Sequence, residues 1–256
     1  GRLPEAEEIS TLSQLLLARP DGLPFDLSGV KVLVTAGGTR EPIDPVRFIG
    51  NRSSGKQGYA MARVMAQRGA DVTLVAGNPA GLIDPAGVHV VHVGSAAQLR
   101  DAVSKYAPES HVLVMAAAVA DFRPANQATS KIKKGPVGEA EPTIELVRND
   151  DVLAGAVRAR SDGQLPNMKA IVGFAAETGD ANGDVLFHAR AKLQRKGCDL
   201  LVVNAVGENR AFEVDHNDGW LLAADGAESA LEHGSKTVIA SRIVDAIVAF
   251  LHSGAR

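Results

Sequence analysis

The chain alternates short, almost uninterrupted apolar runs with segments of helical periodicity, and this alternation restricts the folds open to it. The runs at residues 32–34 (VLV) and 112–115 (VLVM) are typical of strands buried on both faces of a parallel sheet. We therefore predict an α/β fold, a Rossmann-like doubly wound and mostly parallel sheet. The expected strands are residues 30–35, 71–76, 88–93, 111–116, 169–174 and 199–204, and the expected helices are 57–68, 96–106, 151–160, 183–196 and 236–251.

Composition and charge exclude several classes of protein. With 256 residues, 45% of them hydrophobic, the chain can bury one sizeable core. The formal net charge of −3 gives no reason to expect a nucleic-acid partner, and no apolar run approaches the roughly 20 residues that span a bilayer. The single Cys198 excludes an internal disulfide and a multi-cysteine zinc site. We therefore expect a cytoplasmic protein without nucleic-acid or membrane partners.

The sequence divides into an appendage and a main domain. Residues 5–18 have the pattern of an amphipathic helix, which Pro20, Gly22 and Pro24 end. We interpret residues 1–26 as a linker or helical appendage from a larger chain and residues 27–256 as the main domain. Because the sequence starts at Gly1 without a methionine, we expect it either to be a piece of a longer protein or to carry a residue left from its expression.

Two segments break the alternation of strands and helices. Residues 123–141 contain prolines, glycines and three lysines but little apolar content, which is typical of a functional flap or of disorder. Residues 212–223 predict a β-hairpin that turns at Asn217-Asp218-Gly219.

Four predicted strands end in polar or glycine-rich residues. These ends are residues 35–38 (TAGG), 116–121 (AAAVAD), 173–178 (GFAAET) and Asn204. In an open α/β sheet, ligands bind outside the carboxyl ends of the strands. All four ends belong to one rim of one sheet, so a single cleft could gather them.

The segment at residues 50–57 (GNRSSGKQ) has the GxxxxGK spacing of a P-loop. Gln57, however, stands where a P-loop needs a Ser or Thr for Mg²⁺. The preceding strand also ends near Thr35, well before Gly50, whereas a Walker loop follows its strand directly. The segment is therefore not a Walker loop.

A dinucleotide fingerprint does not fit either. Gly37-Gly38 is not GxGxxG, and the second strand ends at Asn78 without a carboxylate for a ribose hydroxyl. What remains is a helix start at residues 53–56 (SSGK), whose free N–H groups and positive dipole attract phosphate. An ordinary serine N-cap is the alternative, and the convergence of Gly37, Gly38 and Lys56 on one rim favours phosphate.

Other candidates keep two interpretations each. Alanines 116–118 could let a helix pack closely or let a ligand lie on exposed backbone, and Asp121 could be a turn cap or a site carboxylate. The basic run at Lys131 is either a solvated patch or, in a flap, a charge that stabilises a transition state. Cys198 is better explained as a packing residue than as a nucleophile.

Five motifs, in this order, resemble one enzyme family. They are AGGTREPIDPVRFIGNRSSGKQG, MAAAVADFRP, KIKK, GFAAET and KGCDLLVVN. Together they resemble phosphopantothenoylcysteine synthetase, the C-terminal half (CoaB) of a bacterial bifunctional coenzyme A biosynthesis enzyme. The resemblance covers residue 27 to the C-terminus. The helix before it resembles the linker from a flavin-dependent decarboxylase half (CoaC), so no flavin is expected in this fragment.

The resemblance implies a ligase reaction. CTP and 4′-phosphopantothenate would form an acyl-cytidylate with loss of pyrophosphate, and the amine of cysteine would then attack the acyl carbon and release CMP. The implied cofactor is Mg²⁺, which would bridge the triphosphate. The implied partners are these small molecules, a second copy of the chain bound through the hairpin near residues 212–220, and the covalently linked decarboxylase half.

The resemblance also implies roles for individual residues. Asn51, Lys131 and Asp121 would be catalytic, with Lys131 stabilising the transferring phosphate. The acid substrate would contact Arg47, supplied by the partner subunit, together with Asn51, Ala117 and Ala118. The nucleotide would contact Gly37, Gly38, Ser53, Ser54, Gly55, Asp121, Lys131, Phe174 and Ala175, and Asp121 would lie near the Mg²⁺.

One position departs from the family pattern, and two rival functions stay open. Where the family commonly has Asn-Pro-Asp, this chain has Asn149-Asp150-Asp151, which keeps the helix N-cap. The KIKK and GFAAET segments resemble the bacterial, CTP-using type rather than the ATP-using eukaryotic type. The rivals are an NADP-dependent short-chain oxidoreductase, against which the missing fingerprint argues, and a non-catalytic nucleotide-binding module.

Overall fold

An eight-stranded sheet organises the protein. The computed structural model describes residues 5–19, 22–79, 81–134, 142–177, 183–205 and 216–254. From one edge to the other, the sheet contains β12 (Glu228–Ser235), β11 (His216–Ala223), β10 (Leu200–Ala205), β9 (Ala170–Glu177), β6 (Val112–Met115), β1 (Lys31–Gly37), β4 (Asp71–Gly77) and β5 (Val88–Val93).

Six of these strands are parallel and confirm the predicted α/β fold. β1 pairs with β4 on one side, with Val32 opposite Val72, and with β6 on the other, with Val32 opposite Val112. The chain builds β1, β4 and β5 outward in one direction and then crosses over to build β6, β9 and β10 in the other. The strand order therefore reverses between β1 and β6, and such a switch point opens a crevice at the carboxyl ends of the strands.

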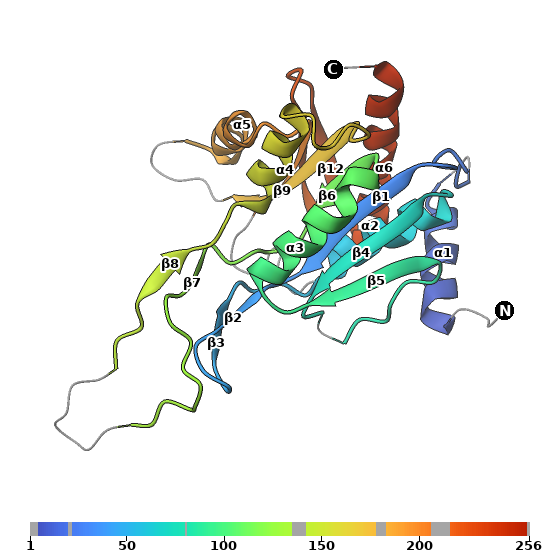
Figure 1. Ribbon diagram of the computed structural model, residues 1–256. Helices are drawn as coiled ribbons and strands as arrows, with labels where there is room; N and C mark the ends of the chain where they lie inside the picture. Colours follow the sequence, from blue (N-terminus) through green and yellow to red (C-terminus); the bar gives the residue numbers. More distant parts are fainter. Residues whose placement is uncertain are drawn as a thin grey trace.

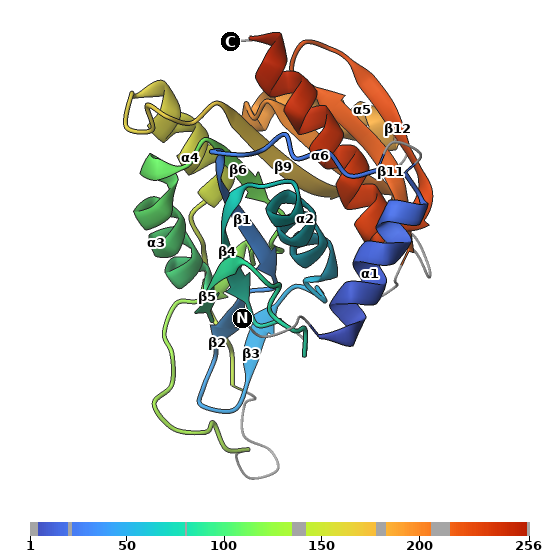
Figure 2. The same cartoon turned by 90° about the vertical axis from the view of Figure 1, so that its right-hand side faces the viewer.

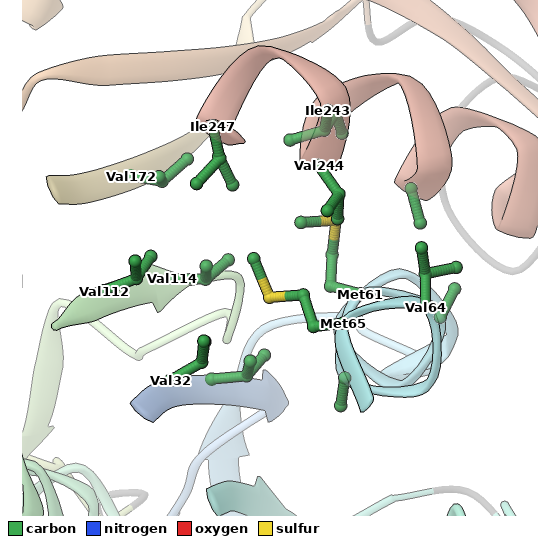
Figure 3. Close-up of a cluster of buried hydrophobic side chains, with 14 of the residues drawn as sticks. Val32, Met61, Val64, Met65, Val112, Val114, Val172, Ile243, Val244 and Ile247 are labelled. Carbon is green, nitrogen blue, oxygen red and sulfur yellow. The ribbon is translucent and has the colours of Figure 1, made fainter. Parts of the chain in front are cut away.

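Helices cover both faces of the sheet (Figures 1 and 2). One face carries α3 (Ala96–Tyr106), α4 (Val152–Ser161) and α5 (Val185–Lys196), with the short 3₁₀ helix η1 (Ala107–Glu109) after α3. The other carries α1 (Ala6–Leu17), α2 (Lys56–Gln67) and α6 (Lys236–Ser253). Figure 3 shows Met61 and Met65 of α2 and Ile247 of α6 packed over strand valines.

The predicted appendage packs on the main domain. Leu15 of α1 is only 1% exposed and belongs to the core cluster beneath α2 and α6. At the C-cap of α2, the buried guanidinium of Arg68 donates to Asp26 at 2.6 and 2.8 Å and to Asp245 at 2.5 Å. Arg19 also donates to Asp245, at 2.7 Å. These ion pairs tie the segment before the first strand to α2 and α6.

Two small antiparallel ribbons extend from the sheet at lower left in Figure 1. One is formed by β2 (Arg40–Pro42) and β3 (Phe48–Gly50), and the other by β7 (Phe122–Pro124) and β8 (Leu146–Arg148). The β7–β8 ribbon is the base of the predicted flap. Residues 125–134 beyond it have no regular secondary structure, and residues 135–141 lie outside the described part of the chain.

The predicted turn at Asn217-Asp218-Gly219 is wrong. These residues lie inside strand β11, which pairs with β12 after a turn at residues 224–227, while residues 212–215 are outside the described part. A β-bulge interrupts the register between Asn217 and Gly219, and a Cβ on Gly219 would lie 2.0 Å from the Val203 carbonyl oxygen. The glycine therefore permits a close backbone approach within a sheet rather than a hairpin turn.

Candidate functional site

A cleft of about 600 Å³ lies at the switch point of the sheet. The start of α2, the loop after β6, the ends of β9 and β10, and the first turns of α4 and α6 line it, together with the last turns of α5. The cleft brings together most of the predicted site residues: Asn51, Ser53, Ser54, Gly55, Ala117, Ala118, Asp121, Phe174 and Ala175.

The start of α2 has the features of an anion site. Its N-cap is Gly55, which has a positive φ of 75° and therefore favours glycine, and no side chain caps the helix. Ser53 Oγ accepts from the Gly55 N–H at 3.3 Å instead of capping the first turn, so the ordinary serine N-cap does not apply. The N–H groups of a first helical turn have no intrahelical partners, and here they border the cleft.

Gly37 and Gly38 support this loop from behind and do not line the cleft. A Cβ on Gly37 would lie 1.9 Å from the Gly77 carbonyl oxygen, and one on Gly38 would lie 3.0 Å from the Asn51 carbonyl oxygen. Gly58, in the first turn of α2, likewise packs against Ala36 at the end of β1. The glycines let the loop and helix approach the strand ends closely.

Hydrogen bonds fix the opposite wall, the loop after β6. The Ala118 N–H donates to the Gly37 carbonyl at 2.8 Å, and the Ala120 N–H donates to Thr39 Oγ1 at 2.9 Å. Asn51 Nδ2 donates to the Val119 carbonyl at 3.1 Å and so joins the two walls. Ala117 and Ala118 present backbone and methyl groups to the cleft, so an extended ligand chain can lie along them.

Lysines that the sequence did not single out complete the cleft. Lys192 and Lys196 lie one turn apart on α5, and Lys236 begins α6. Lys196 pairs with Asp151, the N-cap of α4, and Lys192 pairs with Glu177. The i, i+4 spacing of Lys192 and Lys196 was a signal that they share a face, but not that this face meets the cleft.

Asp151 keeps its negative charge in this setting. Burial alone would raise the pKa of its carboxyl, but hydrogen bonds from Lys196 and the Ala154 N–H, with the charges of Lys196 and Arg158, outweigh burial and lower it. The Asp151 carboxylate is therefore charged at neutral pH, and its pair with Lys196 links α4 to α5 at the cleft rim.

Besides Gly37 and Gly38, two further predicted site residues lie outside the cleft. Arg47 lies in the loop between β2 and β3, and Lys131 is exposed in the flap. Arg47 Nη2 donates to the Ile132 carbonyl at 2.7 Å, so these two regions contact each other. They do not meet Asn51 or Asp121 at the cleft within the described chain.

A carboxylate of the cleft can help to bind a metal, but only together with metal-binding groups that a ligand supplies. In the part of the chain that the structure describes, no three His, Cys, Asp or Glu side chains cluster as a metal site. Asp121 is an exposed carboxylate at the rim, while Asp150 pairs with Arg100 at 2.6 Å. Mg²⁺ usually binds through one or two carboxylates plus substrate phosphates, so Asp121 fits a metal that arrives with a nucleotide.

Cys198 is a packing residue, as its sequence context suggested. It is 1% exposed in the core beneath α4 and α5. Burial raises the pKa of its thiol to about 11, so it is not a nucleophile at neutral pH.

Comparisons with known proteins agree on one family. Residues 27–251 match the family model "DNA/pantothenate metabolism flavoprotein C-terminal domain". The chain is 82% identical over 99% of its length to the coenzyme A biosynthesis bifunctional protein CoaBC of Mycolicibacterium smegmatis, of which it covers 61%. It is 43% identical over 88% of its length to CoaBC of Vibrio vulnificus (strain CMCP6), of which it covers 53%. The chain thus spans about three fifths or less of these relatives.

A solved structure agrees with the fold. The crystal structure of the C-terminal domain of a coenzyme A biosynthesis bifunctional protein CoaBC aligns with a TM-score of 0.71 at 34% identity. The alignment covers 89% of this chain and 98% of that domain. None of the helices in the described ranges is both long and apolar enough to cross a membrane.

Proposed function

Because the chain belongs to the DNA/pantothenate metabolism flavoprotein C-terminal domain family, we propose that it ligates 4′-phosphopantothenate to cysteine at the expense of CTP. The resemblance to phosphopantothenoylcysteine synthetase drawn from the motifs is confirmed at the level of the family. The observation that carries the proposal is the uncapped start of α2, which borders the cleft at the switch point beside several lysines.

The charge of the cleft suits two phosphorylated anions. Five basic side chains line it, against three acidic ones: Arg52, Lys56, Lys192, Lys196 and Lys236 against Asp121, Asp150 and Asp151. Backbone N–H groups at the α2 terminus add fixed positive potential without a mobile side chain. Holding nucleotide and acid together in this field supplies the proximity that a two-substrate ligation needs.

The proposed substrate positions follow the walls of the cleft. The triphosphate lies on the loop at residues 53–56, with Lys192 and Lys196 beyond it, and the cytosine lies beside Phe174 and Ala175. Pantothenate lies along Ala117 and Ala118, with its carboxylate near Asn51. Asn51, which joins the two walls, is the residue proposed to lie where the acid meets the α-phosphate.

The chemistry proceeds in two steps. A carboxylate oxygen of phosphopantothenate attacks the α-phosphorus of CTP, and the bond to the β-phosphate breaks to release pyrophosphate. The amine of cysteine then attacks the acyl carbon, loses a proton and expels CMP. Lys131 on the closing flap and the α2 N–H groups stabilise charge on the phosphates. No covalent enzyme intermediate is needed, in accord with the buried, protonated Cys198.

Mg²⁺ supplies charge neutralisation for the triphosphate when it is bound. Asp121 is the residue proposed to hold it, since this carboxylate stands at the rim beside the N–H-rich loop. We extend the proposal to the assembly: a homodimer in which Arg47 serves the partner's site, and a fused decarboxylase half in the longer protein, as the CoaBC names of the relatives suggest.

The rival functions have less support. For an NADP-dependent oxidoreductase, β4 should end with a group that holds the ribose, yet Asn78 there donates to the carbonyls of Gly38 and Gly94 and so serves the fold. A non-catalytic nucleotide-binding module would need a site for the nucleotide alone, whereas the cleft also has a second wall at Ala117 and Ala118 along which an acid substrate can lie.

One assay separates the three functions. The chain is incubated with 4′-phosphopantothenate, cysteine, Mg²⁺ and CTP, and pyrophosphate and product mass are followed. The ligase yields stoichiometric pyrophosphate, CMP and phosphopantothenoylcysteine, and a folded chain that binds CTP without releasing pyrophosphate is a binding module. Turnover of NADPH instead would support the oxidoreductase.

A matched pair of variants locates the nucleotide. Lys192→Gln should raise the CTP KM about tenfold, the loss expected for a charge-assisted hydrogen bond of about 1.4 kcal/mol. Lys105→Gln, on the exposed face of α3, should leave it unchanged. Equal effects would contradict a role of α5 in nucleotide binding.

A further inference from the structure

Asp44 is a buried carboxylate outside both core clusters. It lies in the loop between β2 and β3, and its side chain is 0% exposed. Oδ1 accepts from the N–H groups of Val46 and Arg47, each at 2.8 Å. Oδ2 accepts from Arg47 Nε at 3.0 Å, Arg47 Nη2 at 2.6 Å and the Ile132 N–H at 3.1 Å. One carboxylate thus receives five donors from two segments 88 residues apart.

Arg47 is held by one edge of its guanidinium. Its Nε and Nη2 face Asp44, and Nη2 also donates to the Ile132 carbonyl at 2.7 Å. Nη1 makes no hydrogen bond to any described residue, and 48% of the side chain is exposed. A guanidinium anchored along one edge presents the other in a fixed direction, which suits recognition of a phosphate.

The same contacts hold the flap. Both the N–H and the carbonyl of Ile132 bind the Asp44–Arg47 pair, and the Ala128 N–H donates to the Ile43 carbonyl at 2.9 Å. The flap is therefore attached to the β2–β3 loop at residues 128 and 132. Lys131 lies between these two attachments with its side chain exposed.

We propose that Asp44 is a positioning residue which fixes Arg47 and the Lys131 segment of the flap as one unit. The proposal rests on the proposed ligase function for its kinetic consequences only, since the attachment itself is a property of the substrate-free chain. Asp44 touches no substrate in this account. It fixes both the direction of Arg47, the cation proposed for the acid's phosphate in the partner's site, and the flap segment that carries Lys131.

The alternative is that Asp44 only shapes the β2–β3 turn through the Val46 and Arg47 N–H groups. Asparagine keeps one carbonyl oxygen and can still serve such a turn, but its amide cannot accept from Arg47 and Ile132 with the other atom. Asp44→Asn therefore spares the turn and removes the contact with the flap. Asp44→Glu keeps the negative charge and should retain part of the contact with the flap.

The first experiment measures the attachment without substrates. In hydrogen exchange of the flap, the protection of the Ile132 amide in Asp44→Asn should fall at least tenfold relative to the parent chain. Asp225→Asn is the control, because Asp225 makes a comparable bond to the Ala227 N–H in the β11–β12 turn. Unchanged protection in a folded Asp44→Asn would overturn the proposal, and this readout does not depend on whether the chain is a ligase.

The second experiment measures the consequence. Asp44→Asn should raise the phosphopantothenate KM and lower the rate of pyrophosphate release, each about tenfold or more, since misplacement near 1 Å costs up to about 100-fold. In an Arg47→Ala/Lys131→Ala background the same change should have less than a threefold effect, because the residues through which Asp44 acts are gone. Full additivity would overturn the proposal.

A second variant tests the same attachment without changing Asp44. If Asp44→Asn does not fold, Ile132→Pro removes the N–H that binds Asp44 while leaving the carboxylate in place. It should reproduce the flap exposure and the fall in pyrophosphate release with the β2–β3 loop still protected. Normal activity of Ile132→Pro would contradict the proposal.

Discussion

Gly58 sets how closely the start of α2, the proposed phosphate-binding end, can approach the sheet. A Cβ at this position would lie 2.5 Å from Ala36 Cβ, 2.9 Å from Ala36 Cα and 2.9 Å from the Thr35 carbonyl oxygen. Ordinary contacts are about 3.5–4.0 Å, so Gly58→Ala must push α2 away from β1 by close to 1 Å. Two of the three neighbours are backbone atoms and cannot turn aside.

The magnitude follows from two opposing terms. Overpacking against backbone costs about 3 kcal/mol, the upper part of the usual range, while replacing glycine by alanine in a helix gains about 1 kcal/mol. The net loss is about 2 kcal/mol, or about 4–8 °C in Tm for a chain of this size. The shift also moves the loop at residues 53–55, so pyrophosphate release should fall by about 10- to 100-fold.

Gly155 provides the matched control. It lies in α4, and an added Cβ would meet only Arg158 Nη2, at 3.9 Å. Gly155→Ala should therefore be stabilised by about 0.5–1 kcal/mol through helix propensity. Urea unfolding and pyrophosphate release are measured for both variants. If Gly58→Ala gains stability as Gly155→Ala does, or keeps full activity, the close packing of α2 on β1 does not shape the site.

Four further outcomes are expected. Lys131→Ala should slow acyl-cytidylate formation in a pulse-quench assay without changing the unfolding midpoint, because an exposed lysine contributes little to stability. Arg47→Ala should raise the KM of phosphopantothenate far more than that of CTP, and equal changes would refute its assignment. Iodoacetamide should label Cys198 in urea but not in the native chain at pH 7, since its thiol is buried with a pKa of about 11. The hydrogen bond from Arg68 lowers the pKa of Asp26. The stability that Asp26 contributes is therefore complete above the ordinary carboxyl pKa and is lost as the pH falls through the lower folded-state pKa. Asp26→Asn should reduce this loss of stability at acid pH, measured as the free energy of unfolding against pH.

The fold could be predicted because its signals are local. The predicted strand at residues 88–93 and helix at residues 96–106 have the bounds of β5 and α3, and β4 extends one residue beyond the predicted 71–76. Strands buried on both faces leave continuous apolar runs, and helices leave a 3.6-residue period, so the sequence carries both directly.

The edge of the sheet could not be predicted in the same way. β12 was not expected, because most of its residues are exposed and only Leu231 is buried, so no alternating pattern marks it. The sequence predicts the hairpin turn at Asn217-Asp218-Gly219, whereas the chain turns at the second Asp-Gly pair, Asp225-Gly226. An Asp-Gly pair fits both a turn and a bulge, and only the pairing with β10 distinguishes them.

The candidate site likewise has residues that the sequence predicts and residues that it does not. The motifs at the strand ends and the α2 loop could be predicted, since the topology of a doubly wound sheet gathers strand ends at one rim. Three residues could not be predicted, because only contacts with segments distant in the sequence place them at the cleft or the flap: Lys192, Lys236 and Asp44. A lysine on a helix or an aspartate in a turn has an ordinary local explanation until such a contact is known.

The most direct test of the ligase assignment is a rapid-quench measurement of the first half-reaction. The chain is mixed with CTP, Mg²⁺ and 4′-phosphopantothenate, with cysteine withheld, and pyrophosphate and the bound acyl species are counted per active site. We expect a burst approaching one pyrophosphate and one acyl-cytidylate per site, followed by CMP release only when cysteine is added. Pyrophosphate that appears only with cysteine present, or none from a folded, CTP-binding chain, would contradict it.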